Sequence, residues 1–276
     1  MASGKSPHSP PHAPQQDGAL AGCTIVITRP VGTGATLARR VRGLGGIALL
    51  LPGLSLRATP DAVTLRAQWL SAQQDDVLIF TSPAAVRYAM ALAPCDTKAT
   101  VIAVGHATAR ALRDRGIDAQ VPAARQDSEG LLQLPSIQQL QGTRVALITA
   151  PGGRGLLQEQ LVARGAALRE VYAYGRTAPR LNRRHIDAVL HLPEASYVLL
   201  SSGEALQNLM KQLPDAAWQQ LCKATAIVSS ERIAEQARSA GFVRLCLARS
   251  AAQADLLATA RDACSHGRHE ASRTGC

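Results

Sequence analysis

Short apolar runs alternate along this chain with amphipathic segments that have helical spacing. The first pair is CTIVITRP, which starts at Cys23, and GATLARRVRGLG, which starts at Gly34. Further apolar runs, each followed by a helical segment, begin at Asp76, Thr100, Arg144, Ser196, Ala224 and Val243. Uninterrupted apolar strands between helices are typical of a parallel sheet that is buried on both faces. The pattern therefore predicts an α/β fold.

The chain also repeats itself. VITRPVGTG from Val26 is similar to LITAPGGRG from Leu147. Two further pairs are similar in the same order, at 77–94 and 197–214 and at 98–116 and 223–241. All three pairs are separated by about 120 residues, which indicates a duplication and predicts two similar α/β domains of ordinary size. We expect the functional site in the cleft between them, where binding sites are common.

The formal net charge is +10, from 30 Lys and Arg against 20 Asp and Glu. Such a charge suits nucleic acid, an acidic membrane or a small polyanion. Aromatic residues make up only 3% of the chain, which argues against binding by base stacking. No apolar stretch approaches the roughly 20 residues of a membrane helix, and the start of the chain lacks the apolar core of a signal peptide. We therefore expect neither nucleic acid nor a membrane as a partner.

The cysteines are widely spaced and form no CxxC pair: Cys23, Cys95, Cys222, Cys246, Cys264 and Cys276. This spacing argues against a disulfide framework or a zinc site and favours a reducing cytoplasm. Segments 1–18 and 264–276 are polar, and we expect both to be disordered tails. Two histidines and the last cysteine in the second tail leave metal binding as an alternative to a solvated tail.

Small hydroxyl residues and glycines follow the predicted strands, at 28–30, 81–83, 105–108, 149–153, 201–203 and 229–230. In open parallel sheets, ligands bind at the carboxyl ends of the strands, where free helix N-terminal N–H groups suit an anion. Each hydroxyl taken alone is also a normal helix cap. GxSxG, the phosphate-binding GxxxxGK[ST], the dinucleotide-binding GxGxxG and metal-ligand clusters are all missing from the sequence. These features predict a protein that binds a ligand with several carboxylates or phosphates, either as an enzyme or as a non-catalytic binding protein. They disfavour a nucleotide-binding enzyme.

Several motifs, taken in their order and spacing, carry a family resemblance. They are ITRP (27–30), IFTSPAAV (79–86), VGHATARAL (104–112), EVYAYGRT (170–177), LLSSGEALQNL (199–209) and VSSERIAEQARSAG (228–241). Together they cover nearly everything between the tails. The chain resembles the uroporphyrinogen-III synthase family of tetrapyrrole biosynthesis.

The resemblance implies two flavodoxin-like domains with interleaved topology. Residues 19–52 and 175–263 would form an outer domain, and residues 53–174 an inner domain. A two-stranded connector, with strands near 48–57 and 168–177, would join the domains and allow hinge motion.

The resemblance also implies a reaction. A hydro-lyase of this family closes hydroxymethylbilane, a linear tetrapyrrole with eight carboxylates, to uroporphyrinogen III in the interdomain cleft. The terminal hydroxyl leaves as water, and ring D is inverted through an azafulvene cation and a spiro-pyrrolenine. No cofactor and no metal are implied. We expect a cytoplasmic monomer whose contact with hydroxymethylbilane synthase is at most transient.

The resemblance assigns a catalytic role to Tyr174, whose phenol would donate a hydrogen bond to the departing hydroxyl. The alternatives are a packed connector tyrosine and a misassignment with Tyr172, since residues two apart on a strand share a face. The substrate-binding candidates are Arg29, Thr81, Ser82, Gly105, Thr108, Ser201, Ser202, Ser230, Arg232 and Lys223.

Three of these candidates have open alternatives. Lys223 begins a predicted strand, so its match is equally consistent with a structural role. Arg29 is either a bidentate carboxylate ligand or a surface arginine. Ser230 begins a segment that lacks the second Gly-x-x-Thr-Ala turn of many relatives, and Ser229, Ser230 and Arg232 would replace its threonine hydroxyl.

Overall fold

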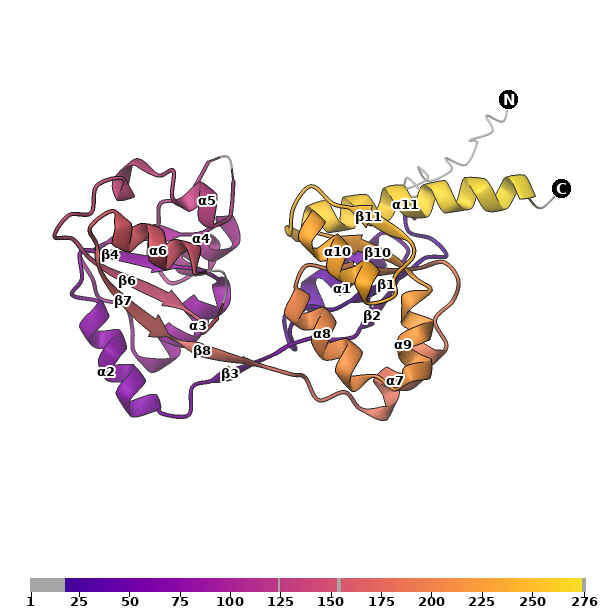
Figure 1. Cartoon of the computed structure of the whole chain (residues 1–276), viewed down its shortest axis with the longest axis horizontal. Helices are drawn as coiled ribbons and strands as arrows, with labels where there is room; N and C mark the ends of the chain where they lie inside the picture. The colour runs from indigo at the N-terminus through magenta and orange to yellow at the C-terminus, as the bar shows by residue number, and fades with distance from the viewer. Residues whose placement is uncertain (1–17, 124, 153–154, 275–276) are drawn as a thin grey trace, which may run out of the picture. The chain divides into compact units, whose positions relative to one another are not determined.

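The computed structural model describes residues 18–274, apart from residues 124, 153 and 154, and gives side chains up to residue 266. The predicted tail 1–18 lies outside the described residues, except for Gly18. The chain divides into two compact units (Figure 1). Unit 1 comprises Met1–Ser55 and Ala178–Cys276, and unit 2 comprises Leu56–Thr177.

Unit 1 contains a five-stranded parallel sheet of order β11-β10-β9-β1-β2. Its strands are β1 (Thr24–Ile27), β2 (Ile47–Leu50), β9 (Ser196–Leu200), β10 (Thr225–Val228) and β11 (Leu245–Leu247). Its helices are α1 (Ala35–Gly43), α7 (Arg183–Leu190), α8 (Gly203–Gln212), α9 (Asp215–Cys222), α10 (Glu231–Ser239) and α11 (Gln253–Thr274). Successive strand residues point to opposite faces, so Val26 packs toward α7–α10 while Ile25 and Ile27 pack toward α1 and α11.

Unit 2 contains a four-stranded parallel sheet of order β5-β4-β6-β7. Figure 1 labels β4, β6 and β7, which lie side by side in this order. Its strands are β4 (Val77–Phe80), β5 (Thr100–Ala103), β6 (Arg144–Thr149) and β7 (Ala167–Tyr172). Its helices are α2 (Ala62–Ala72), α3 (Pro83–Leu92), α4 (His106–Arg113), α5 (Ser128–Leu131), η1 (Pro135–Ile137) and α6 (Leu156–Ala163). Phe80 and Ile148 pack toward α2, α3 and α4, whereas Ile79 and Leu147 pack toward α5, η1 and α6.

The two sheets have the same internal order. The repeated sequence segments place β6 where β1 lies, β4 where β9 lies and β5 where β10 lies. Beyond β5, a parallel bridge between Ile102 and Gln120 lies at the position of β11. The predicted α/β class with parallel sheets is confirmed, and the duplicated segments occupy equivalent strands.

The predicted connector segments are each divided in two. Strand β2 belongs to the sheet of unit 1, and after Pro52 and Gly53 the chain forms β3 (Ser55–Ala58). Likewise, β7 belongs to the sheet of unit 2, and after Ala173 the chain forms β8 (Tyr174–Thr177). Strands β3 and β8 pair only with each other, so the two-stranded ladder is shorter than 48–57 and 168–177.

The segment 264–276 is not a tail over most of its length, because α11 continues through it to Thr274. Cys264 is buried, as are Leu256, Leu257 and Ala260 on the preceding turns, so the apolar face of the helix extends past the predicted end. Cys264 also forms a disulfide with Cys23, next to β1. The cysteine spacing argued against a disulfide framework, and this one disulfide departs from that prediction. Spacing along the chain could not reveal a pair that tertiary folding brings together.

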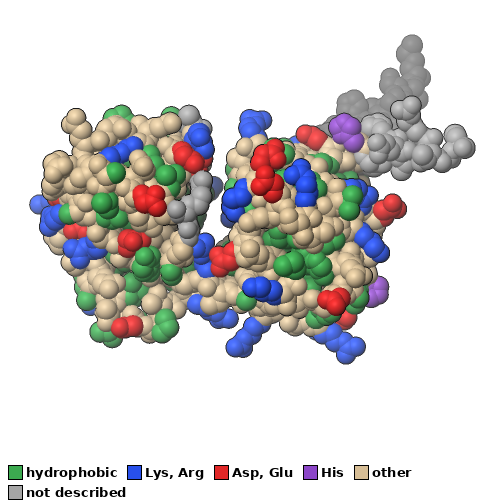
Figure 2. Space-filling model, in the orientation of Figure 1, with side chains coloured by type: hydrophobic (Ala, Val, Ile, Leu, Met, Phe, Trp, Pro, Cys, Tyr) green, Lys and Arg blue, Asp and Glu red, His purple; other side chains and the backbone are tan. Residues whose placement is uncertain are grey.

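Charged side chains are scattered over the surface, with acidic and basic residues interspersed on the face shown in Figure 2. Within the described part of the chain, no helix is long and apolar enough to cross a membrane. The same residues contain no group of three or more His, Cys, Asp or Glu placed to hold a metal ion.

Candidate functional site

The residues that directly follow β4, β5 and β6 form the carboxyl edge of unit 2. Thr81 follows β4 and Thr149 ends β6, and because these strands are parallel neighbours, their side chains meet. The Thr81 hydroxyl donates to Thr149 Oγ1 at 2.9 Å. The Thr81 backbone N–H donates to the Ile148 carbonyl, which extends the strand pairing to the edge. A pair of hydroxyls therefore lies directly beside the N-terminus of α3.

Ser82 caps α3 and contacts the predicted catalytic tyrosine. Its backbone is extended, and its Oγ accepts a hydrogen bond from the Ala85 N–H at 3.0 Å. Pro83 occupies the first turn, where its missing N–H costs nothing. The same Ser82 Oγ lies 3.1 Å from Tyr174 Oη, at the start of β8. Tyr174 is only 7% exposed, so this contact holds a nearly buried phenol at the N-terminus of a helix.

Tyr172 and Tyr174 do not share an environment. Tyr172 ends β7 and is 41% exposed, and its hydroxyl donates to Glu170 Oε2 at 3.0 Å. This hydrogen bond raises the pKa of Tyr172. Because the chain leaves the sheet at Ala173, the rule that residues two apart on one strand share a face does not apply here. Of the two tyrosines, Tyr174 is the one whose hydroxyl contacts Ser82, directly after β4.

The N-terminus of α4 is largely occupied by the protein itself. Gly105 caps the helix, and a Cβ added there would lie 3.0 Å from Gln126 Oε1. That oxygen already accepts the His106 backbone N–H at 3.0 Å. Thr108 is only 2% exposed, so its hydroxyl offers almost no surface to a ligand. The predicted anion contacts at Gly105 and Thr108 are therefore much less accessible than those at Thr81 and Ser82.

The residues that follow β1, β9 and β10 form the carboxyl edge of unit 1. The buried Thr28 hydroxyl donates to the Leu199 carbonyl at 2.6 Å and joins the ends of β1 and β9. The next residue, Arg29, is half-buried, and its Nε has no hydrogen-bond partner among the described residues. Desolvation by burial lowers the pKa of Arg29. An unpaired, partly desolvated guanidinium is costly unless it meets an anion, which argues against a simple surface arginine.

Two further helices begin at this edge. Ser202 caps α8 through the Ala205 N–H at 3.3 Å, and Ser230 caps α10 through the Ile233 N–H at 3.4 Å. Ser201 and Ser202 are both partly exposed. The start of α8 lies against the second turn of α10, because a Cβ on Gly203 would meet the side chain of Gln236.

The side chain of Arg232, in the first turn of α10, is exposed. Its Nη1 donates weakly to Gln236 Oε1 at 3.5 Å. Arg29, Ser201, Ser202, Ser230 and Arg232 thus belong to one edge of one sheet.

Lys223 lies at the opposite end of the same sheet. It follows α9 and precedes β10, whereas Ser230 follows that strand. Lys223 is exposed beside a cavity of about 320 Å³ that is also lined by Ser196, Gln220 and Arg244. Its backbone carbonyl accepts a hydrogen bond from the Arg244 guanidinium. The structure therefore does not bring Lys223 together with the other candidates of unit 1.

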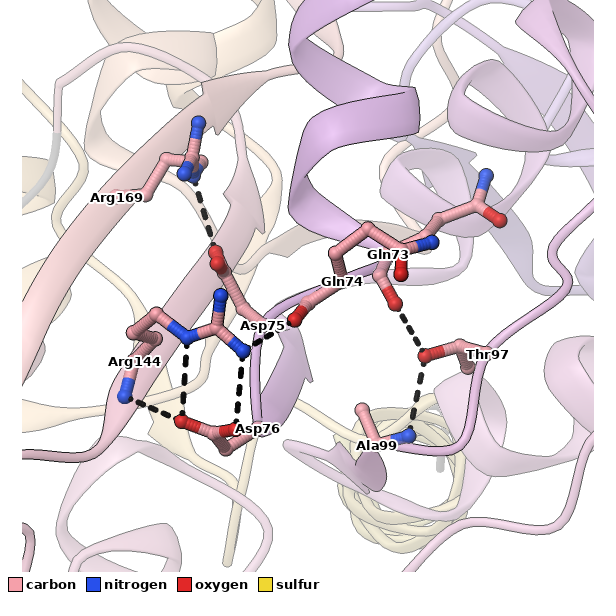
Figure 3. A network of polar contacts seen from close by, with 8 residues as sticks. All are labelled: Gln73, Gln74, Asp75, Asp76, Thr97, Ala99, Arg144 and Arg169. Atoms are coloured by element: carbon pink, nitrogen blue, oxygen red, sulfur yellow. Dashed lines mark hydrogen bonds and ion pairs between the residues drawn. The ribbon is translucent and has the colours of Figure 1, made fainter.

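A cavity of about 470 Å³ lies at the amino ends of β4 and β5, away from the carboxyl edge of unit 2. Two of its acidic residues are paired with arginines, as Figure 3 shows: Asp75 contacts Arg169 at 3.0 Å, and Asp76 contacts Arg144 at 3.2 Å. Asp76 also accepts the Arg144 backbone N–H, and the Arg144 contacts lower the pKa of Asp76. These ion pairs join β6 and β7 to the loop before β4, so a structural role accounts for them.

The sequence-based reasoning missed one residue beside the site. Tyr88, on α3, stacks its ring on that of Tyr174, with ring centroids 5.4 Å apart and an interplanar angle of 16°. Tyr88 follows the cap Ser82 by six residues, and at 3.6 residues per turn this spacing does not place the two side chains on the same side of a helix. The sequence therefore carried no signal for Tyr88, because nothing in it indicates that β8 lies against α3.

Two parallel-sheet units, each with hydroxyls and helix N-termini at its carboxyl edge, define an α/β protein suited to an anionic ligand. The family described as uroporphyrinogen-III synthase HemD matches residues 35–258. The uroporphyrinogen-III synthase of Salmonella typhimurium is 33% identical over 228 residues, which cover 79% of this chain and 92% of that protein. The chain belongs to the uroporphyrinogen-III synthase family, which confirms the resemblance seen in the sequence.

Two further relatives are consistent with this family membership. The uroporphyrinogen-III synthase of Escherichia coli is 32% identical over 228 residues, again covering 79% of this chain and 92% of that protein. A solved structure of mutant uroporphyrinogen III synthase from Thermus thermophilus covers 89% of this chain and all of its own, with a TM-score of 0.57 at 20% identity. The similarity to this solved structure supports the two-domain α/β fold. The members of the family are lyases of tetrapyrrole biosynthesis.

Proposed function

We propose that this chain closes hydroxymethylbilane to uroporphyrinogen III, with loss of one water and inversion of ring D, and that Tyr174 is its proton donor. Family membership supports the reaction, since the family match spans most of the chain. One observation carries the proposed role of Tyr174: its hydroxyl lies at the carboxyl edge of unit 2, within hydrogen-bond distance of a helix-capping serine. A phenol held in this way suits proton donation to a leaving hydroxyl.

The proton balance of this step is simple. The terminal C–O bond of the substrate breaks, its oxygen takes one proton from Tyr174 and leaves as water, and the substrate carbon becomes a cation. The substituted α-carbon of ring D bonds to this cation and gives the spiro-pyrrolenine. The bond from the same α-carbon to its bridging carbon then breaks and re-forms at the free α-carbon of ring D, which inverts the ring and releases one proton from the tetrapyrrole. That proton restores the phenol, so the net change is the loss of one water. No oxidant or reductant is needed.

The proposal takes Ser82 as the donor in its contact with Tyr174. Ser82 Oγ accepts from the Ala85 N–H, and in the contact between Ser82 Oγ and Tyr174 Oη either hydroxyl could donate. With Ser82 as the donor, Tyr174 keeps its O–H free to donate to the substrate. When that proton leaves, the phenolate faces a hydroxyl donor at the positive end of α3, which stabilises the negative charge.

The carboxylates of the substrate would bind at the carboxyl edges. In unit 1 we assign Arg29, Ser201, Ser202, Ser230 and Arg232 to this role, because they combine an unpaired guanidinium, an exposed guanidinium and two helix N-termini. In unit 2 we assign Thr81 and Ser82. Gly105 and Thr108 shape the N-terminus of α4, and Lys223 contributes to the amino end of the unit 1 sheet, so these three have structural roles in the proposal.

The decisive experiment couples the purified protein to hydroxymethylbilane synthase and separates the product isomers. We expect uroporphyrinogen III. Isomer I, the spontaneous product, would overturn the proposal if it were the sole product, and the protein would then be a binding protein without this activity. The matched control is the same mixture with Tyr174→Phe, in which isomer I should increase at the expense of isomer III.

The proposal includes a monomeric, cytoplasmic enzyme that acts without a resident cofactor and contacts hydroxymethylbilane synthase only transiently. The cytoplasmic location rests on family membership and not on the cysteines, two of which form a disulfide. Sedimentation of the chain alone and with that synthase tests the first and last of these statements. A stable dimer of this chain, or a lasting complex with the synthase, would contradict them.

A further inference from the structure

The phenol of Tyr174 is held by two residues of the same helix. Ser82, at the N-cap of α3, contacts its oxygen at 3.1 Å. Tyr88, farther along α3, stacks on its ring at 5.4 Å between centroids, with the planes only 16° apart. A single hydrogen bond fixes the position of an oxygen but leaves the ring free to tilt about it. The stack supplies the missing restraint on the plane of the ring.

Tyr88 is itself held in place. Its hydroxyl donates to the Leu56 carbonyl of β3 at 3.0 Å. Because β3 pairs with β8, the hydroxyl of Tyr88 contacts one strand of the ladder and its ring contacts the other. The guanidinium of Arg87 lies 4.8 Å from the Tyr88 ring centroid, on a side chain that is exposed. Through the side chain of Tyr88, helix α3 thus contacts both strands of the ladder.

We propose that Tyr88 is a positioning residue for Tyr174: it fixes the plane of the phenol so that the O–H points toward the leaving hydroxyl of the substrate. This inference rests on the proposed role of Tyr174. Misplacing a reacting group by a fraction of an ångström slows a reaction without weakening substrate binding, because alignment affects the transition state more than the bound substrate. The role therefore concerns kcat and not KM.

The test is a double-mutant cycle with Tyr88→Leu and Tyr174→Phe. In the wild-type background, Tyr88→Leu should lower kcat roughly tenfold and change KM by less than about twofold. In the Tyr174→Phe background the same substitution should have almost no effect on kcat, because the group that Tyr88 aligns no longer donates a proton. Tyr88→Phe keeps the stack and loses only the bond to Leu56, so its effect should be about two- to threefold. If Tyr88→Leu does not fold, Tyr88→Phe can be used for the same cycle.

A matched control separates alignment from packing. Met90 lies on α3 and packs against the same core cluster, so Met90→Ala reports a general weakening of the helix. Its effect on kcat should be small and equal in both backgrounds. If Tyr88→Leu and Tyr88→Phe also lower kcat by equal factors in both backgrounds, Tyr88 is a packing residue and the inference is wrong. If Tyr174→Phe alone leaves kcat unchanged, the proposed proton donor is wrong instead, and the two failures are told apart.

Discussion

Ser82 Oγ and Tyr174 Oη lie 3.1 Å apart, although 92 residues separate them along the chain. The serine is the N-cap of a helix that follows a central strand, and the tyrosine is the first residue of one strand of the two-stranded ladder. This contact ties the proposed proton donor to the positive end of a helix. The hydrogen bonds at this point should make the activity sensitive to changes in single side chains.

Removing the Tyr174 hydroxyl tests the proton donor directly. Tyr174→Phe should lower kcat by about a hundredfold, which is at the low end of what general acid catalysis contributes. The ring and its stack on Tyr88 remain, so the circular dichroism spectrum and thermal midpoint should change little. Tyr172→Phe, on an exposed side chain bonded to Glu170, is the control and should keep full turnover. Nearly wild-type kcat for a folded Tyr174→Phe protein would rule the role out.

Removing the Ser82 hydroxyl should have two effects. Ser82→Ala deletes the cap of α3 and should cost about 1 kcal/mol of unfolding free energy. It also deletes the partner of Tyr174, so we expect kcat to fall by roughly tenfold. Asp61→Ala is the matched control, because Asp61 caps α2 in the same unit through the Thr64 N–H at 3.0 Å. An equal loss of kcat in both variants would show that lost capping alone explains the effect.

Replacing Arg29 should separate binding from stability. Arg29→Met should raise KM by roughly tenfold to a hundredfold, because a hydrogen bond to a charged group contributes about 1.5–3 kcal/mol. The unfolding free energy should stay the same or increase, since a partly desolvated charge without a partner is lost. Arg39→Gln, on the exposed surface of α1, should change neither quantity. A destabilised Arg29→Met protein with normal KM would identify Arg29 as a structural residue.

The Cys23–Cys264 disulfide should stabilise unit 1. Cys264→Ser should lower the unfolding free energy by about 2–4 kcal/mol, because the bond restricts the unfolded chain. Thiol titration of the denatured protein before and after reduction checks the bond itself, and reduction should expose both sulfurs. Both cysteines belong to unit 1, so kcat should not change, since Tyr174 and its partners belong to unit 2. An unchanged thiol titre after reduction would show that the cysteines are not bonded.

Acid should weaken the tie between Asp76 and Arg144. The Arg144 contacts hold the pKa of Asp76 below its ordinary value of 3.8. A depressed carboxyl pKa contributes stability that is present above the unfolded value and is lost as the pH falls below 3.8 through the folded value. Asp76→Asn should therefore unfold at lower urea concentration than the wild type at about pH 7, and the difference between the two midpoints should shrink as the pH falls below 3.8. A midpoint difference that does not change between neutral and acidic pH would contradict this account.

Much of this protein is determined by its sequence alone. Alternation of apolar strands with helices predicted the parallel sheets, and the repeated segments predicted which strands would be equivalent. Ser82, Ser202 and Ser230 were identifiable as helix caps because a cap depends only on the residues a few positions away. These properties are local, so a pattern of neighbouring residues is enough to reveal them.

The tertiary structure alone decided which side chains meet. In the structure, Tyr174 and not Tyr172 has its hydroxyl beside Ser82, and Tyr88 stacks on Tyr174. Thr108 is buried, Lys223 lies at the far end of its strand, and Cys23 is bonded to Cys264. Each of these outcomes depends on strand order or on pairing between distant segments. Contacts of this kind arise only when the whole apolar surface is buried, and no window of the sequence contains both partners.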